Sequence, residues 1–217
     1  MVLLGISAGS WTRIVLGSSV DRAGRMVSTQ LSLVRAEAVA KRRSVALIMP
    51  GSVCFPTTDF PRPHNYSAMR AAYVTNDNKF ESWVPGTSWI FLPEGAIIAQ
   101  CDGDSAELTP PTPPATEYVL NDTTPCSENE DCGAPVTLDD DHKMDYVDKS
   151  GASKTLITGS FRAVVFKKDG SCDNKAYITL MEGIVPKGET SPINKQPSNL
   201  NVLEVNSLTG KVRFIFH

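Results

Sequence analysis

Two short segments contain residue types that could support chemistry. The first, residues 5–9, reads GISAG and matches the G-x-S-x-G segment that holds a serine nucleophile on a strained turn between a strand and a helix. That turn needs a parallel sheet with alternating helices, and the sequence shows no such alternation. None of the histidines has an evident nucleophile and orienting acid; they are His64, His142 and His217. We therefore expect no catalytic site, and we interpret the small residues around Ser7 as permitting close helix packing.

The second segment is acidic. It contains carboxylates of the kind that Ca²⁺ prefers, namely Asp139, Asp140, Asp141 and Asp145. The spacing of an EF-hand is absent, and consecutive aspartates cannot all point at one ion. A solvated acidic loop is the favoured interpretation, and a calcium site is the alternative.

The cysteines give no metal-binding pattern. There are five, with no CxxC pair among them, which argues against zinc: Cys54, Cys101, Cys126, Cys132 and Cys172. Cys126 and Cys132 flank the polar segment SENED, and we expect a disulfide to close this loop in an oxidising compartment. Two reduced thiols are the alternative. A pair between Cys54 and Cys101 is a weaker expectation, because sequence does not fix connectivity. No cofactor is predicted.

Charge is distributed unevenly along the chain. The net charge is -3, but residues 1–49 hold seven Arg and Lys against Asp21 and Glu37, so the remaining chain is strongly acidic. The acidic part has no basic stripe with interleaved aromatic residues, so nucleic acid is a poor partner. No small-molecule substrate is predicted either.

A long helix must position whatever this chain presents. Its apolar residues recur every three or four positions and form one spine: Val20, Ala23, Val27, Leu31, Val34 and Ala38. Residues 18–43 contain no proline and only Gly24, so we predict one helix from about residue 3 to residue 43. At 1.5 Å per residue it would be about 60 Å long, and its first half should project from the rest. The basic run at 41–43 suits the negative end of the helix dipole.

After Arg43 the pattern becomes that of a β protein. Short β-branched or aromatic runs alternate with turn residues, and Gly170 and Gly210 lie between runs as in hairpins. The prediction is an α+β fold in which an N-terminal helix, residues 1–43, packs on an antiparallel sheet or sandwich, residues 44–217. The C-terminal half of the helix should cover the sheet that residues 44–49 begin.

Residues 101–150 interrupt this pattern. They carry thirteen acidic residues against Lys143 and Lys149, together with the proline-rich segment TPPTPPATE. We predict an insertion on the surface of the β-rich head and not a separate domain.

Four segments in a fixed order resemble the GspH/FimT/FimU family, the minor pseudopilins of type II secretion systems and minor pilins of type IV pili. They are LVRAEAVAKRRSVAL, SWIFLPEGAII, VVFKKDGSCDNKAYITL and NVLEVNSLTGKVRFIF. In that family a long helix ends in a similar R-x-E-A segment, and a strand pair around a T-G-K-V-R-like ending closes the head. The resemblance excludes residues 101–150 and the extreme N-terminus.

The resemblance implies a non-catalytic subunit with a pilin-like fold. Its helix would anchor in the bacterial inner membrane and pack with other minor and major pseudopilins, while the head lies in the periplasm. The spine would then be an interface as well, with Val20, Val27, Leu31 and Val34 burying against both the head and neighbouring helices. The opening MVLLGISAG is interpreted as the middle of the family's apolar span, which would place the processing and N-methylation site upstream of Met1. Residues 1–19 are therefore expected to be a partial membrane or fibre segment.

A binding module is the alternative from another class. A secreted β-sandwich with a helical stalk, such as an adhesin or carbohydrate binder, could expose Tyr66, Tyr73, Trp83 and Trp89 as a recognition surface. The favoured interpretation places Trp89 and Tyr73 in the core and Trp83 near a sheet edge.

Overall fold

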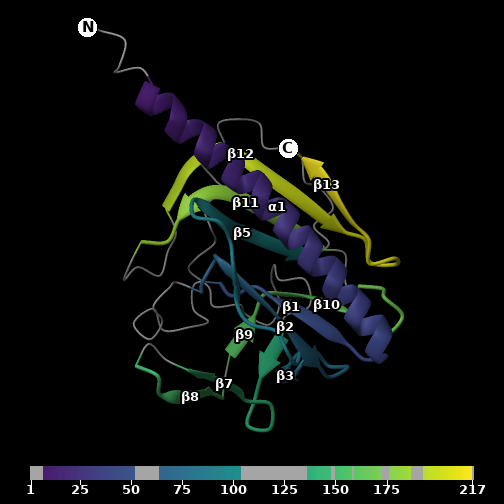
Figure 1. Cartoon of the computed structure of the whole chain (residues 1–217). Helices are drawn as coiled ribbons and strands as arrows, with labels where there is room; N and C mark the ends of the chain where they lie inside the picture. Colours follow the sequence, from purple (N-terminus) through teal and green to yellow (C-terminus); the bar gives the residue numbers. More distant parts are fainter. Residues whose placement is uncertain are drawn as a thin grey trace, which may run out of the picture.

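One long helix and two antiparallel sheets share a common core (Figure 1). The computed structural model describes residues 7–51, 64–103, 136–147, 150–157, 159–172, 176–186 and 193–216. Every named strand pair in these ranges is antiparallel. The predicted α+β class, a helix packed on antiparallel sheets, is confirmed.

Helix α1 runs from Ser7 to Lys41 without interruption. Its 35 residues give a length of about 50 Å. It stops because Arg42 adopts a left-handed conformation, φ 54°, and the N–H of Arg43 then reaches back to the carbonyl of Ala38 at 3.2 Å. This is the geometry of a Schellman cap built on a residue other than glycine. The cap turns the chain at once into the first strand, with no loop between.

The first sheet has buried strands at its centre. Its order is β10-β1-β2-β3, with β4 also paired to β2. The bounds are β1 Val45–Ile48, β2 Ala68–Val74, β3 Phe80–Trp83, β4 Ile90–Phe91 and β10 Ala163–Phe166. In β1, Val45 and Leu47 face the helix, whereas Ala46 and Ile48 face a second cluster on the opposite side. Both faces are covered, which explains why this strand is a continuous apolar run.

The second sheet is formed largely by the C-terminal part of the chain. Its order is β13-β12-β11-β5. The bounds are β5 Ala96–Gly103, β11 Ala176–Ile184, β12 Ile193–Val205 and β13 Val212–Phe216. The hairpin predicted at Gly210 is confirmed, since β12 and β13 pair on either side of it.

The hairpin predicted at Gly170 is wrong as a strand pairing. A tight turn does form, with Gly170 N–H bonded to the Lys167 carbonyl at 2.8 Å and one isolated bridge between Phe166 and Cys172. However, β10 pairs in the first sheet and β11 in the second. The turn therefore carries the chain from one sheet to the other.

Two small sheets lie beside the first. β6 (Val136–Leu138) pairs with β9 (Gly159–Phe161), and β7 (Met144–Val147) pairs with β8 (Ser153–Leu156). The side chains of Val136, Leu138 and Met144 are buried in the second cluster. The surface insertion is thus narrower than predicted, because residues 101–103 complete β5 and residues 136–147 belong to the head. Residues 104–135 lie outside the described part of the chain.

The helix packs on both sheets and not only on the one that follows it. Its spine shares a core with Val45 and Leu47 of the first sheet and with Ile178 and Leu203 of the second. In Figure 1, α1 crosses the sheet that contains β11 and β12 and ends beside β1 and β10. The prediction that the helix covers the first sheet was therefore right but incomplete.

Val34→Asp tests whether the helix is part of this core. Val34 is 3% exposed, whereas the adjacent Leu33 is 57% exposed. A buried, unpaired carboxylate costs several kcal/mol, against a net stability of about 5–15 kcal/mol. We expect Val34→Asp to abolish soluble, folded protein, and Leu33→Asp to change the urea unfolding free energy by no more than about 0.5 kcal/mol. Equal effects of the two substitutions would contradict the observed orientation of the helix.

Candidate functional site

Helix α1 is the candidate functional element, and it divides into two parts. From Val20 onward its spine is buried in the head, with Val20 itself 1% exposed. The helix begins at Ser7, more than three turns earlier. Figure 1 shows these N-terminal turns projecting beyond the sheets. The projecting part is helical backbone that the two sheets do not cover.

The spine residues are occupied by their own head. All six are between 0% and 3% exposed: Val20, Ala23, Val27, Leu31, Val34 and Ala38. They leave no surface that a neighbouring helix could bury. Any partner of this half of α1 must therefore contact its outer face, where Leu33 and Val39 are 57% and 46% exposed.

Polar contacts fix the rotation of the helix on the head. Asp21 Oδ1 accepts a hydrogen bond from Asn201 Nδ2 of β12 at 3.0 Å. Glu37 Oε1 accepts one from the Tyr73 hydroxyl of β2 at 2.7 Å, and this bond raises the pKa of Tyr73. The guanidinium of Arg43 stacks over the Tyr73 ring, 3.9 Å from its centroid. The helix is thus tied to both sheets.

Three segments that are distant in sequence meet at Arg35. The Nε of Arg35 donates a hydrogen bond to the carbonyl of Gly170 at 3.0 Å. A Cβ placed on Gly210 would lie 2.1 Å from that same carbonyl oxygen and 2.9 Å from Arg35 Nε. Both glycines have positive φ, 82° and 60°. We call Arg35, Gly170 and Gly210 the joint, because they connect α1 to the crossover turn between β10 and β11 and to the turn between β12 and β13.

The joint unites three of the four segments that resemble the pseudopilin family. Arg35 belongs to RAEA, Gly170 to KKDG and Gly210 to LTGK. The turn signals of the two glycines are visible in the sequence. Their convergence on one helix residue is not, because it depends on the passage of the chain from one sheet to the other.

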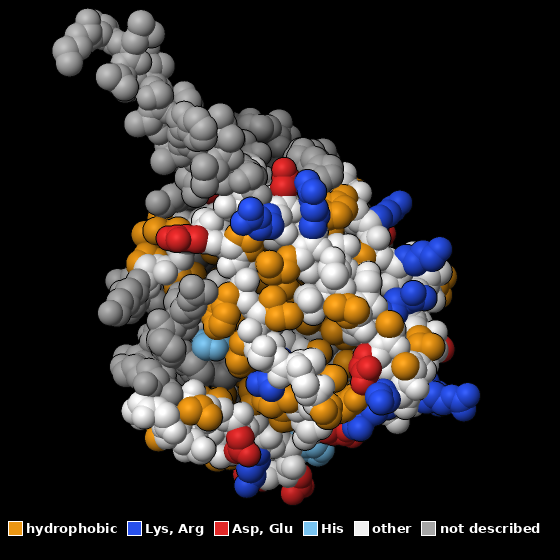
Figure 2. Space-filling model, viewed as in Figure 1, with side chains coloured by type: hydrophobic (Ala, Val, Ile, Leu, Met, Phe, Trp, Pro, Cys, Tyr) orange, Lys and Arg blue, Asp and Glu red, His pale blue; other side chains and the backbone are white. Residues whose placement is uncertain are grey.

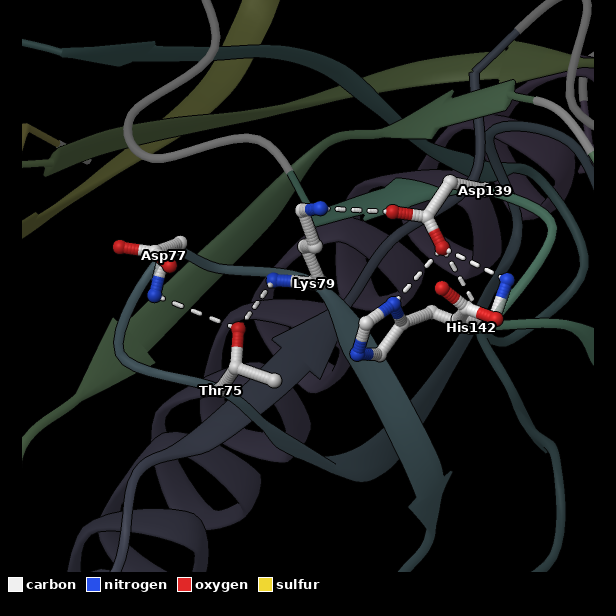
Figure 3. A network of polar contacts seen from close by, with 6 residues as sticks. Thr75, Asp77, Lys79, Asp139 and His142 are labelled. Carbon is white, nitrogen blue, oxygen red and sulfur yellow. Dashed lines mark hydrogen bonds and ion pairs between the residues drawn. The ribbon is translucent and has the colours of Figure 1, made fainter.

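The acidic segment forms a polar network and not a cluster of ligands (Figure 3). Asp139 Oδ2 pairs with Lys79 Nζ at 2.7 Å. Its Oδ1 accepts hydrogen bonds from the N–H groups of Asp141 and His142 at 3.0 and 2.9 Å, and lies 2.7 Å from His142 Nδ1. Asp145 Oδ1 accepts a bond from the Thr155 hydroxyl at 2.6 Å.

These contacts assign Asp139 a structural task. The Lys79 ammonium and the His142 ring hold the pKa of Asp139 well below its usual range, and Asp139 in turn raises the pKa of Lys79. The side chain closes the turn between β6 and β7 and ties it to the residue before β3. In the described part of the chain, no group of three or more His, Cys, Asp and Glu is placed to hold a metal ion.

Of the remaining candidate residues, the structure describes the side chain of His64 alone. Ser7 is the first residue of α1. His64 is 7% exposed and packs edge-on against Trp89 and Phe91, with centroids 5.1 and 5.0 Å away. His217 lies outside the described residues.

The predicted disulfides stay predictions. Cys126 and Cys132 lie outside the residues that the structure describes, as do Cys54 and the side chain of Cys101. Cys172 is buried in the main core, 5% exposed.

Of the four aromatic residues considered for a recognition surface, two are buried and the other two contact each other. Tyr66 and Tyr73 are 4% and 7% exposed. Trp83 lies on the edge strand β3 and meets Trp89 edge to face at 5.2 Å between centroids. Arg70 covers a face of Trp83, with its guanidinium carbon 4.3 Å from the ring centroid. These rings do not form a row of open, parallel faces.

Comparison with known proteins finds no matching family model, curated protein or solved structure. Among the described residues, no helix combines the length and the apolar character needed to cross a membrane.

Gly210→Ala tests the joint. The new Cβ would clash with the Gly170 carbonyl, so the backbone must move, and we expect a loss of about 3 kcal/mol or more in the free energy of unfolding. Gly86 is the matched control, since its φ is also positive, 78°, but nothing lies within 4 Å of its Cβ position. Gly86→Ala should cost only the left-handed strain of about 1–2 kcal/mol. Urea unfolding measures both losses. Equal decreases in the free energy of unfolding of the two variants would contradict the close packing at Gly210.

Asp139→Asn tests the polar network through pH. Because the folded-state pKa of Asp139 is depressed, its stabilisation is present above the unfolded pKa of about 3.9 and is lost as pH falls through the lower folded pKa. Asp139→Asn should be less stable than the wild type at pH 7, and the difference should shrink at pH 3. Asp140→Asn, which changes an exposed neighbour, should match the wild type in urea unfolding at pH 7. A constant difference between pH 7 and pH 3 would contradict this account.

Proposed function

We propose that this chain is a minor pseudopilin or minor pilin: a non-catalytic structural subunit of a type II secretion pseudopilus or a type IV pilus tip. It assembles with other pseudopilins through its N-terminal helix and so supports protein secretion. One observation carries the proposal. A single continuous helix is buried in the head from Val20 onward, yet extends more than three turns beyond it.

The joint supports the same function. The segments RAEA, KKDG and LTGK resemble those of the GspH/FimT/FimU family, and in this chain they contact each other at Arg35, Gly170 and Gly210. These contacts offer a physical reason for the three segments to occur together, because the residues that fit in one segment depend on the residues it contacts in the other two. A helix that must be held rigidly at its C-terminal end is suited to transmit force and orientation from a fibre to a head.

In the proposed mechanism the protein acts by binding to neighbouring subunits and not by catalysing a reaction. The projecting turns of α1 pack with the helices of neighbouring subunits, and burial of apolar area supplies roughly 25 cal/mol per Å². In this proposal the N-terminal part of the helix anchors the protein in the inner membrane, and the β-rich head lies in the periplasm. Small residues at Ser7, Ala8 and Gly9 allow close approach between helices. The cytoplasmic motor of such systems would supply the energy, so no residue of this chain need hydrolyse anything.

Deletion of residues 1–19 tests the proposal directly. The spine begins at Val20, so the truncated chain should remain soluble and folded, with a urea unfolding free energy close to that of the full chain. It should nevertheless fail to restore fibre assembly or protein secretion in a strain that lacks the gene. The full chain, expressed at the same level, is the positive control.

Two results would overturn the proposal. If the truncated chain restored assembly as well as the full chain, recognition would reside in the β-rich head. If removal of the gene changed neither fibres nor secretion, the chain would not be an assembly subunit.

A further inference from the structure

The C-terminal end of α1 and two turns of the sheets form one corner of the head. The pairing of Val45 with Phe166 places the end of the helix beside the turn at 167–171. The N–H of Cys172 then bonds to the Ser207 carbonyl at 2.7 Å, which brings in the turn at 206–210. Arg35 contacts both turns through the joint. Residues far apart in sequence are therefore neighbours on this surface.

Two exposed apolar side chains lie at this corner. Of the seven large apolar residues exposed among those described, Val39 lies in the last turns of α1 and Leu208 in the turn between β12 and β13. Leu208, at the tip of the hairpin turn, is 85% exposed, the highest value of the seven. Val39 lies against Gly170, where a Cβ would come within 2.9 Å of its Cγ2.

Cations occupy the same helix end and the same two turns. Lys41, Arg42, Lys168 and Lys211 are all exposed, and within the described ranges none of them has a carboxylate within ion-pair distance. Figure 2 shows Lys and Arg side chains along the right-hand side, where α1 and the two turns end in Figure 1, with hydrophobic side chains between them. We call Val39, Lys41, Arg42, Lys168, Leu208 and Lys211 the basic corner.

We infer that the basic corner binds an acidic segment of a neighbouring protein subunit, with an apolar side chain of that segment packed on Leu208 and Val39. Four cations without carboxylate partners are complementary to such a segment, and charge complementarity directs association and register. The exposed side chain of Leu208 offers apolar area that a bound partner would remove from water. The contacts of the joint hold the turn that contains Leu208, so the position of this side chain is fixed relative to the head.

Other occupants fit this surface less well. A nucleic acid would need a longer basic stripe with aromatic side chains for stacking, and the corner has neither. An anionic membrane would attract the same cations, but the corner lies at the opposite end of α1 from the projecting turns, about 30–50 Å away along the helix. This second argument rests on the proposed function, in which the N-terminal end faces the membrane.

Site-specific photocrosslinking in the full chain tests the inference. A benzophenone amino acid replaces Leu208, in host cells whose own copy of the gene is removed, and mass spectrometry identifies the adduct. Val147, 59% exposed on β7, is the control position. We expect an adduct at position 208, absent at 147, with a peptide of net negative charge from another fibre subunit. Lys168→Glu combined with Lys211→Glu should reduce it about tenfold or more, since two favourable charge pairs become repulsive.

Lys143→Glu, which reverses an exposed lysine of the β6–β7 turn, should leave the adduct unchanged. Thermal unfolding should be the same for all variants, because each altered side chain is exposed. No adduct above the level at position 147, an adduct with lipid or nucleic acid, or an adduct that survives the double charge reversal would overturn the inference. If the chain lacking residues 1–19 still assembled while the charge-sensitive adduct persisted, the proposed function would fail and the basic corner would stand.

Discussion

Burial of one face of α1 against two separate sheets is the interaction on which this molecule depends. The two sheets share a core with the helix, and each has a further cluster on its outer side. A fully buried Val or Leu contributes about 1.5–3 kcal/mol, so the four large spine residues together are comparable with a whole net stability of about 5–15 kcal/mol. Without the C-terminal part of α1, the sheets would lose their common core. The same burial removes the spine from any external interface, so partners must use the projecting turns or the outer face.

The joint explains how so long a helix can be attached firmly at one end. Arg35 bonds to the turn that carries the chain between the sheets, and that turn packs against the β12–β13 hairpin. Glu37 and Asp21 tie the helix to one strand of each sheet. Helix, crossover turn and hairpin therefore move as one unit. A torque on the projecting turns would reach the head through these contacts, which suits a fibre subunit and also gives the basic corner a fixed shape.

Much of the fold could be predicted because local patterns report local structure. The spacing of Val20, Val27 and Leu31 predicts a buried stripe, and the run VALI predicts a strand on which the helix packs. The turn glycines were visible as well. Long-range partners were not. The turn residues around Gly170 would suit a hairpin and a crossover equally well. The two differ only in whether β10 and β11 pair with each other or with other strands, and that pairing is not visible in the sequence. Likewise, the sequence allows Asp139 as a calcium ligand, whereas in the structure its carboxylate oxygens contact Lys79 and His142.

The central claim is that α1 divides its length between its own head and its neighbours, and amide hydrogen exchange along the helix tests it most directly. In the isolated chain, residues 20–38 should be protected to nearly the global stability, whereas residues 7–19 should exchange rapidly, because these turns project beyond the two sheets. After assembly with the proposed partner pseudopilins, residues 7–19 should become protected while residues 20–38 stay unchanged. Equal protection of the two segments in the isolated chain, or rapid exchange of residues 7–19 within the fibre, would contradict the account.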